Sequence, residues 1–132
     1  MGSRIPTTVL VDELHALRDR VPGVGGSVVS TADGMLVAAD TATVHPESAA
    51  ALAAAMLGLG RRTAAEFGVG GLRDVVARCN GGYVVVLAIG EQALLVVLGD
   101  EGLDVVGLHR ESPSTVSRLG ELLGVLPAVR PY

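Results

Sequence analysis

The chain contains no lysine and almost no aromatic side chains. All ten basic residues are arginine, and aromatic residues make up only 2% of the sequence, with no tryptophan. Without lysine, the chain cannot form a Schiff base, a P-loop phosphate contact through lysine or a lysine general base. The scarcity of rings that could stack on bases, together with a net charge of −4, argues against nucleic-acid binding.

Cysteine occurs once, as Cys79. A single cysteine excludes a disulfide framework within the chain and a cysteine-rich zinc site. Because free cysteine is among the most frequently buried residue types, we predict that Cys79 is a small buried side chain.

Long hydrophobic runs are also missing. The longest apolar stretch, from Tyr83 to Leu98, is interrupted by Gly90-Glu91-Gln92, which is typical of two strands around a turn and predicts no membrane insertion. The start of the chain has no charged leader followed by an apolar segment, so we expect a cytoplasmic protein. The 132 residues are 49% hydrophobic, which predicts one domain over residues 7–126 with flexible termini at 1–6 and 127–132.

Hydropathy periodicity predicts an α+β fold with the order α-β-β-α-β-β-β-α, in which helices flank a five-stranded antiparallel sheet. The Asp33-Gly34 pair is typical of a tight hairpin turn. Ser112-Pro113 resembles a helix cap followed by a first-position proline, which leaves open whether residues 102–124 form one helix or two. The predicted helices are 7–20, 46–67 and 113–123, and the predicted strands are 25–31, 35–39, 72–79, 83–89 and 93–98.

The central helix carries two kinds of apolar surface. Large residues recur at helical spacing, and six alanines lie between Ala49 and Ala55. Small residues allow another backbone to approach closely, so we predict that this helix packs on two sides, only one of which the sheet can occupy. The large residues are Leu52, Met56, Leu59, Thr63 and Phe67; the predicted contacts with a second copy are Ala51, Ala55 and Gly58.

The strand predicted at 72–79 carries charge on one face, where Asp74, Val76 and Arg78 alternate with apolar residues. Charges of this kind favour an edge strand, or one that pairs outside the domain. If two copies pair antiparallel about a two-fold axis near Val76, Asp74 of each copy lies opposite Arg78 of the other. We therefore predict that these three residues belong to a dimer interface.

No group of residues satisfies the requirements of an active site. The glycine-rich segments 23–26 and 68–71 lead from a helix into a strand, whereas a phosphate-binding loop leads from a strand into a helix. His15, His45 and His109 are far apart in sequence, and we expect them to be solvated or to cap helices. The sequence therefore predicts a protein that is not an enzyme and that has no catalytic residues, metal or cofactor.

The residues at 14–29 and 33–38 resemble the Roadblock/dynein light chain family, which opens with a helix, a Val-Pro-Gly-Val-like break and a hairpin turning on Asp-Gly. This resemblance implies a homodimer whose sheet continues through the third strand, with the two central helices side by side. It also implies that a Ras-like small GTPase is a partner, with a sensor-kinase-like protein as a further one. Arg61 and Arg62 are then candidate contacts with the GTPase.

Two other functions stay open at this point. Profilin-like and sensor-like folds share an antiparallel sheet flanked by helices, so the chain could be a small-ligand sensor module. It could also be a scaffold subunit that only dimerises. The leading hypothesis is a non-enzymatic homodimeric regulator or adaptor that modulates the nucleotide cycle or localisation of its GTPase.

Overall fold

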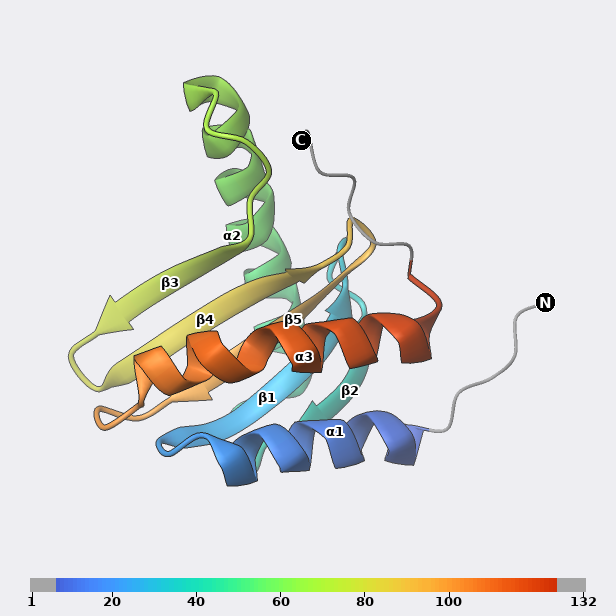
Figure 1. Cartoon of the computed structure of the whole chain (residues 1–132), viewed down its shortest axis with the longest axis vertical. Helices are drawn as coiled ribbons and strands as arrows, with labels where there is room; N and C mark the ends of the chain where they lie inside the picture. Colours follow the sequence, from blue (N-terminus) through green and yellow to red (C-terminus); the bar gives the residue numbers. More distant parts are fainter. Residues whose placement is uncertain (1–6, 126–132) are drawn as a thin grey trace.

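The computed structural model describes residues 7–125, which form three helices and five strands in the predicted order (Figure 1). Residue 126 and the termini predicted to be flexible, 1–6 and 127–132, lie outside the described residues. The elements are α1 (Thr7–Arg20), β1 (Val24–Thr31), β2 (Leu36–Asp40), α2 (Pro46–Phe67), β3 (Asp74–Cys79), β4 (Gly82–Ile89), β5 (Ala93–Gly99) and α3 (Val105–Leu123).

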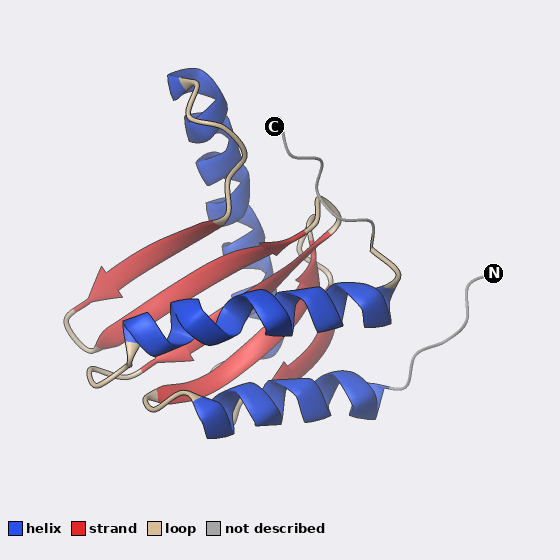
Figure 2. Ribbon diagram, in the orientation of Figure 1, coloured by secondary structure: helices blue, strands red, loops and turns tan. Residues whose placement is uncertain are grey.

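The five strands form one antiparallel sheet in the order β2-β1-β5-β4-β3. Helices α1 and α3 cover one face of this sheet and α2 covers the other (Figure 2). Strands β4 and β5 lie inside the sheet and are covered on both faces, in agreement with their apolar residues on both alternating sides. The predicted α+β fold is therefore confirmed.

The β1–β2 connection is the hairpin predicted from Asp33-Gly34. Gly34 has a φ of 96°, a conformation that costs glycine little, and the amide of Thr31 donates to the carbonyl of Met35 at 2.9 Å. The hairpin sets β1 in the sheet so that Val29 faces α1 and α3 while Val28 faces α2.

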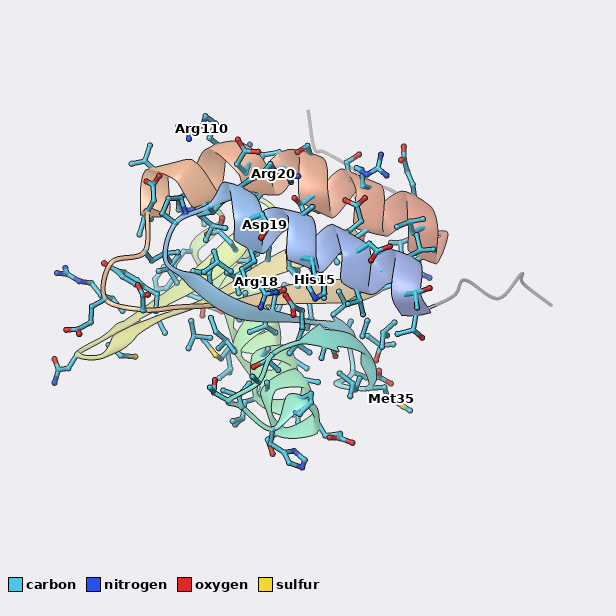
Figure 3. All side chains as sticks on the ribbon, turned by 90° about the horizontal axis from the view of Figure 1, so that it is seen from below. His15, Arg18, Asp19, Arg20, Met35 and Arg110 are labelled. Atoms are coloured by element: carbon cyan, nitrogen blue, oxygen red, sulfur yellow. The ribbon has the colours of Figure 1, made fainter. Side chains whose placement is uncertain are left out.

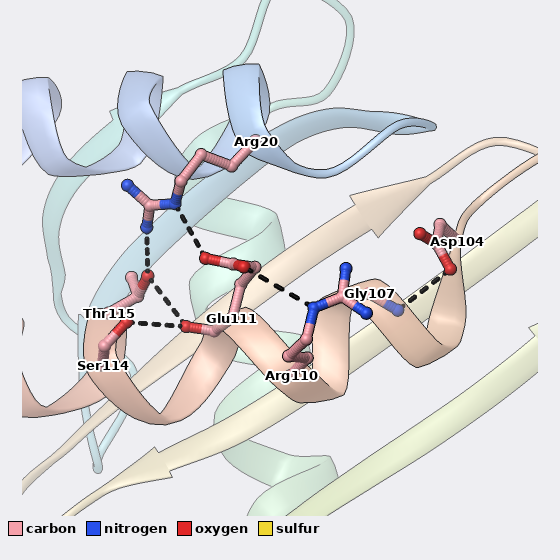
Figure 4. Close-up of polar contacts among 7 residues, drawn as sticks. All are labelled: Arg20, Asp104, Gly107, Arg110, Glu111, Ser114 and Thr115. Carbon is pink, nitrogen blue, oxygen red and sulfur yellow. Dashed lines mark hydrogen bonds and ion pairs between the residues drawn. The ribbon is translucent and has the colours of Figure 1, made fainter.

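Helices α1 and α3 run antiparallel and are joined by charged side chains. Arg20 Nε donates to Glu111 at 3.0 Å, and its guanidinium also donates to the buried Thr115 at 3.1 Å (Figure 4). Further along the pair, Arg118 donates to Glu13 at 2.8 Å. Beneath these contacts the leucines of α1, at positions 10, 14 and 17, fill the core at helical spacing.

Helix α3 is one continuous helix, so the prediction of a start at Ser112-Pro113 is wrong. Asp104 is the N-cap, and its carboxylate accepts from the amide of Gly107 at 2.9 Å (Figure 4). Pro113 lies within the helix, where it leaves the carbonyl of His109 without its usual amide donor. The helix continues because a buried stripe crosses the proline, while Pro113 itself faces solvent; the stripe is Leu108, Ser112, Thr115 and Leu119.

Two expectations for the third strand also need correction. Strand β3 begins at Asp74, two residues later than predicted, and Cys79 is exposed where we predicted burial. Cys79 is the last residue of an edge strand, just before the Asn80-Gly81 turn. Helix α2 meets β3 near its other end, at Val75, so nothing among the described residues covers the thiol.

Replacement of Pro113 by alanine is expected to stabilise the protein. The exposed alanine adds an amide that can donate to the carbonyl of His109, and it removes the clash of the proline ring with the preceding turn. The free energy of unfolding should rise by about 1–3 kcal/mol, measured by urea denaturation at a fixed protein concentration. Ser114→Ala, on the same exposed turn, is the control and should change it by less than about 0.5 kcal/mol. Destabilisation by Pro113→Ala would show that α3 is not continuous in solution.

Candidate interaction surface of α2 and β3

Helix α2 contacts the sheet through small side chains and keeps most of its large ones exposed. Ala50, Ala53 and Leu57 are buried against β1, β4 and β5. Because alanines bring the helix close to the sheet, the longer apolar side chains lie on its outer sides. The exposed fractions are 68% for Leu52, 67% for Leu59 and 74% for Phe67. A cluster of this kind on one helix is typical of an interaction surface.

The ends of α2 are fixed by caps. The side chain of His45 accepts from the amide of Ser48 at 3.4 Å, so the expectation of a capping histidine is confirmed at this position. Gly68 ends the helix in the left-handed conformation, with a φ of 64°. Between these caps α2 is long enough for its C-terminal turns to project past the β3 edge of the sheet (Figures 1 and 2).

The two flanks of α2 face different neighbours. A Cβ atom added to Gly60 would lie within 3 Å of Leu72 and Val75, so this flank faces β3. On the opposite flank, Gly34 in the β1–β2 turn lies against Ala51. We refer below to the β3 flank and the hairpin flank of α2.

The predicted interface residues of α2 lie on the hairpin flank. With about 100° of rotation per residue, Ala51, Ala55 and Gly58 are on the side of the helix away from Gly60. All three are exposed, and a Cβ atom added to Gly58 would meet nothing within 4 Å. The large residues lie on the β3 flank and on the outermost side next to it; they are Leu52, Met56, Leu59, Thr63 and Phe67.

The adjacent arginines of α2 have different environments. Arg61 donates to the carbonyl of Gly90 at 3.0 Å and so ties α2 to the β4–β5 turn. Arg62 is exposed, has no hydrogen bond or ion pair to the described residues, and borders a shallow hollow of about 480 Å³ beside Leu59 and Phe67. Of the two predicted GTPase contacts, Arg62 is the one whose guanidinium forms no hydrogen bond or ion pair with the described residues, whereas Arg61 uses one nitrogen to bind Gly90.

Strand β3 is an edge of the sheet and pairs only with β4 among the described strands. The amide of Ala88 donates to the carbonyl of Arg73 at 3.1 Å, so the residues of this strand that hydrogen-bond to β4 are the odd-numbered ones. Because bonded and outward-facing residues alternate along an antiparallel strand, the backbone groups of Asp74, Val76 and Arg78 point away from β4. The three predicted interface residues therefore present unpaired N–H and C=O groups along a regular edge.

The charged side chains of this edge lie on the α3 side of the sheet. The Nε2 atom of His109 is 3.8 Å from a carboxylate oxygen of Asp74, and Val76 is 41% exposed. Arg78 is exposed and forms no ion pair with the described residues. The proximity of His109 to this strand could not be predicted from the sequence, because no local pattern relates positions 35 residues apart.

The opposite edge, β2, is poorly suited to pairing with another strand. It is five residues long, and its register with β1 shifts next to Ser30. Residues of α1 also reach this edge, where His15 and Arg18 lie 3.0 and 3.5 Å from a carboxylate oxygen of Asp40 (Figure 3). Short, irregular and charged edges resist strand addition, so β3 is the better candidate for pairing.

The described residues offer no alternative site with evident chemistry. Among residues 7–125, no three histidine, cysteine, aspartate or glutamate side chains gather as a metal ion would require. A second hollow, of about 270 Å³, lies between the β1–β2 hairpin and the end of α3 and carries no charged group. No helix in this part of the chain is long and apolar enough to cross a membrane.

The element order and the sheet architecture are those of a Roadblock/LC7 domain. Residues 10–99 match the model of this family, and the chain belongs to it. This result confirms the resemblance inferred from residues 14–29 and 33–38.

Individual relatives support the assignment. An uncharacterized protein of Methanocaldococcus jannaschii is 33% identical over 102 residues, which cover 76% of this chain and 88% of the relative. The Roadblock/LC7 domain of Streptomyces avermitilis is 26% identical, with a TM-score of 0.78 over 86% of this chain and 96% of that chain. Myxococcus xanthus MglB shares the fold, with a TM-score of 0.82 at 13% identity over 94% of each chain.

Alanine substitutions at two glycines of α2 should stabilise the protein to different extents. Gly58→Ala adds a methyl group in open space and raises helix propensity, so the free energy of unfolding should rise by about 0.5–1 kcal/mol. Gly60→Ala gains the same propensity, but its methyl group overlaps the ends of the Leu72 and Val75 side chains, which must shift, so this variant should be less stable than Gly58→Ala by about 0.5–1 kcal/mol. Urea denaturation at one protein concentration measures both. Equal stabilisation would contradict close contact between Gly60 and β3, and destabilisation by Gly58→Ala would indicate that Gly58 is a tightly packed contact.

Proposed function

We propose that this chain is a homodimeric, non-enzymatic regulator or adaptor that binds a Ras-like small GTPase in the cytoplasm. One observation carries the proposal: the exposed apolar residues of α2 lie beside an unpaired, regular edge strand, so a single copy leaves both surfaces open. Membership of the Roadblock/LC7 family supports a regulator-type role. A sensor-kinase-like protein is a further partner suggested by the family resemblance alone.

Backbone geometry favours pairing of β3 with β3 of a second copy. The outward-facing residues are 74, 76 and 78, and in an antiparallel pair each must lie opposite an outward-facing residue of the partner strand. Only a few registers satisfy this condition. The central ones place Val76 opposite residue 74, 76 or 78 of the second copy.

Charge favours one of these registers. With Val76 opposite Val76, Asp74 of each copy lies opposite Arg78 of the other, and the interface contains two opposite-charge pairs. Cross-strand pairs of this kind contribute roughly 0.2–1 kcal/mol each. When the partner strand is moved beyond the three central registers, Asp74 comes to lie opposite Asp74 in one direction and Arg78 opposite Arg78 in the other. Both arrangements are destabilising.

The spacing of the helices favours the same register independently. Val75 lies on Gly60 of α2, so the distance between the two copies of Val75 approximates the separation of the two α2 helices. Strand spacing and rise put this distance at roughly 8 Å when Val76 pairs with Val76, and at roughly 5 or 14 Å in the adjacent registers. Packed helices lie about 8–10 Å apart. Only the register with Val76 opposite Val76 therefore suits both the pairing of the strands and the packing of the helices.

Exposed apolar surface supplies most of the driving force in this arrangement. The β3 flank of each α2 faces the other helix, and the projecting C-terminal turns lie beneath the sheet of the second copy. Full burial of a leucine or phenylalanine side chain is worth about 1.5–3 kcal/mol. Leu52, Leu59 and Phe67 thus offer a second copy far more stabilisation than the charge pairs do, and the charges set the register.

Exchange of the two charges tests the register. At about pH 8, Asp74→Arg and Arg78→Asp should each place like charges opposite each other and weaken the dimer about 5–20-fold. The double variant Asp74→Arg/Arg78→Asp restores the pairs in reversed order and should recover most of the affinity, as measured by sedimentation equilibrium. Arg110→Asp, an exposed arginine on the outer side of α3, is the control and should have little effect. Additive weakening in the double variant would rule out this register.

The hairpin flank of α2 stays accessible in this dimer and is the surface on which we place the GTPase. Ala51, Ala55 and Gly58 were expected from the sequence to contact a second copy, but they lie on the side of α2 away from β3, so we assign them to this surface instead. They form a flat strip, and Arg62 lies beside it with a guanidinium free to bind carboxylates. Arg61 is engaged with Gly90, so its contribution is to hold α2 in place. In this mechanism the dimer repositions the GTPase's own residues and supplies no catalytic arginine.

Binding and hydrolysis measurements test the GTPase proposal. Candidate GTPases loaded with GDP or a GTP analogue should be retained by this protein in a state-dependent manner, with a change in hydrolysis rate when it is added. Arg62→Ser should weaken retention about 5–10-fold while leaving the dimer intact, and Arg110→Ser is the matched control. Equal retention in both states with no rate change would leave only the scaffold function. Equal binding by the Arg62 variant would place the contact elsewhere.

A further inference from the structure

His109 lies where the proposed dimer interface meets α3. Its Nε2 atom is 3.8 Å from Asp74, the residue that would also contact Arg78 of the second copy. The side chains of His109 and Asp74 are 45% and 28% exposed, so solvent protons reach the histidine. One carboxylate therefore lies within reach of two potential cations, one from its own chain and one from the second copy.

The other ring nitrogen determines how His109 interacts with Asp74. Nδ1 is 3.1 Å from the carbonyl oxygen of Val105, and because a carbonyl only accepts, Nδ1 carries a hydrogen and donates it. In the neutral ring, Nε2 then has no hydrogen and offers Asp74 no bond. Protonation adds a hydrogen and a positive charge at the atom that faces the carboxylate. The contact therefore changes from weakly repulsive to attractive when the ring gains its second proton.

We infer that protonation of His109 weakens self-association, because it places a competing cation on Asp74 next to Arg78 of the second copy. The inference rests on the proposed dimer and its central register. In a single copy, protonated His109 neutralises Asp74 without opposition. In the dimer, the same proton brings two like charges to one carboxylate, and this repulsion exists only there. Thermodynamic linkage then requires protonation to favour dissociation.

The surrounding charges do not offset this effect. On the sheet, Asp74 and Arg78 of β3 lie on the side of α3, with Tyr83 of β4 opposite Arg78. Within α3, the neighbouring Arg110 pairs with Glu111, which also accepts from Arg20 of α1 on the far flank of the helix. Among the described residues, Asp74 is the only carboxylate that pairs with His109.

The dissociation constant of the full chain, measured by sedimentation equilibrium at about pH 8 and about pH 6, tests this inference. The proposed dimer contains the arrangement of His109, Asp74 and Arg78 twice, and solvent and salt partly screen its charges. The dissociation constant should therefore rise on the order of 3–10-fold at the lower pH. His109→Gln removes the titrating charge and should leave the constant unchanged within about 2-fold. His15→Gln is the matched control, because His15 also pairs with an aspartate but lies at the opposite sheet edge; it should behave like the unmodified chain.

Each outcome is decisive. A dimer whose dissociation constant does not change with pH, or tightens at lower pH, overturns the inference while the proposed dimer stands. Retention of the pH effect in His109→Gln, or its loss in His15→Gln, assigns it to another group and also overturns the inference. A monomer at both pH values overturns the proposed dimer together with this inference. Raising the salt concentration should reduce the pH effect if charge repulsion is its cause.

Discussion

The close contact between α2 and the sheet determines which side chains the molecule exposes. Ala50 and Ala53 are buried where a helix would commonly place leucine or isoleucine, and Leu57 is the largest side chain on that side. Close packing through alanine leaves no room for the remaining large residues, which occupy the other sides of the helix. Three of the nine large apolar side chains that are exposed among the described residues therefore lie on this one helix, namely Leu52, Leu59 and Phe67.

Strand β3 brings a second incomplete surface to the same place. Its backbone groups at Asp74, Val76 and Arg78 have no partner strand within residues 7–125, and α2 meets it at Gly60. A second copy arranged about one two-fold axis at Val76 would satisfy both surfaces. Opposite charges favour one register, and the helix separation that follows from strand spacing and rise favours the same one. On the other face of the sheet, the described residues of α1 and α3 share one hydrophobic core with the sheet, and the ion pairs Arg20–Glu111 and Glu13–Arg118 link the two helices.

Local signals in the sequence were sufficient for the element order and the topology class. Asp33-Gly34 predicted its hairpin, and the alternating charges of β3 predicted an edge. Pro113 was misleading because helix capping rules are local, whereas the buried stripe from Leu108 to Leu119 that keeps α3 continuous depends on tertiary packing. The exposure of Cys79 follows from its position at the end of an edge strand, which composition does not reveal.

The candidate surface was predictable in kind but not in detail. The alanines and the large apolar residues of α2 indicated two packing surfaces. Periodicity does not determine which of these two sides of the helix faces the sheet. The contacts of Gly60 with β3 and of Gly34 with Ala51 are needed to orient the helix. His109 could not be assigned from sequence, because its proximity to Asp74 results from the way α3 crosses the sheet.

Strand β3 is also where the two helical layers meet. Val75 contacts α2 on one face of the sheet, and Asp74 contacts α3 through His109 on the other. In the proposed dimer, a protein bound to α2 therefore lies next to the junction between the copies. If such a partner favours the paired arrangement, pairing must increase its affinity by the same factor, since coupling between two binding equilibria is reciprocal. Regulation of self-association and regulation of partner binding would then be one equilibrium, controlled by the few residues around β3.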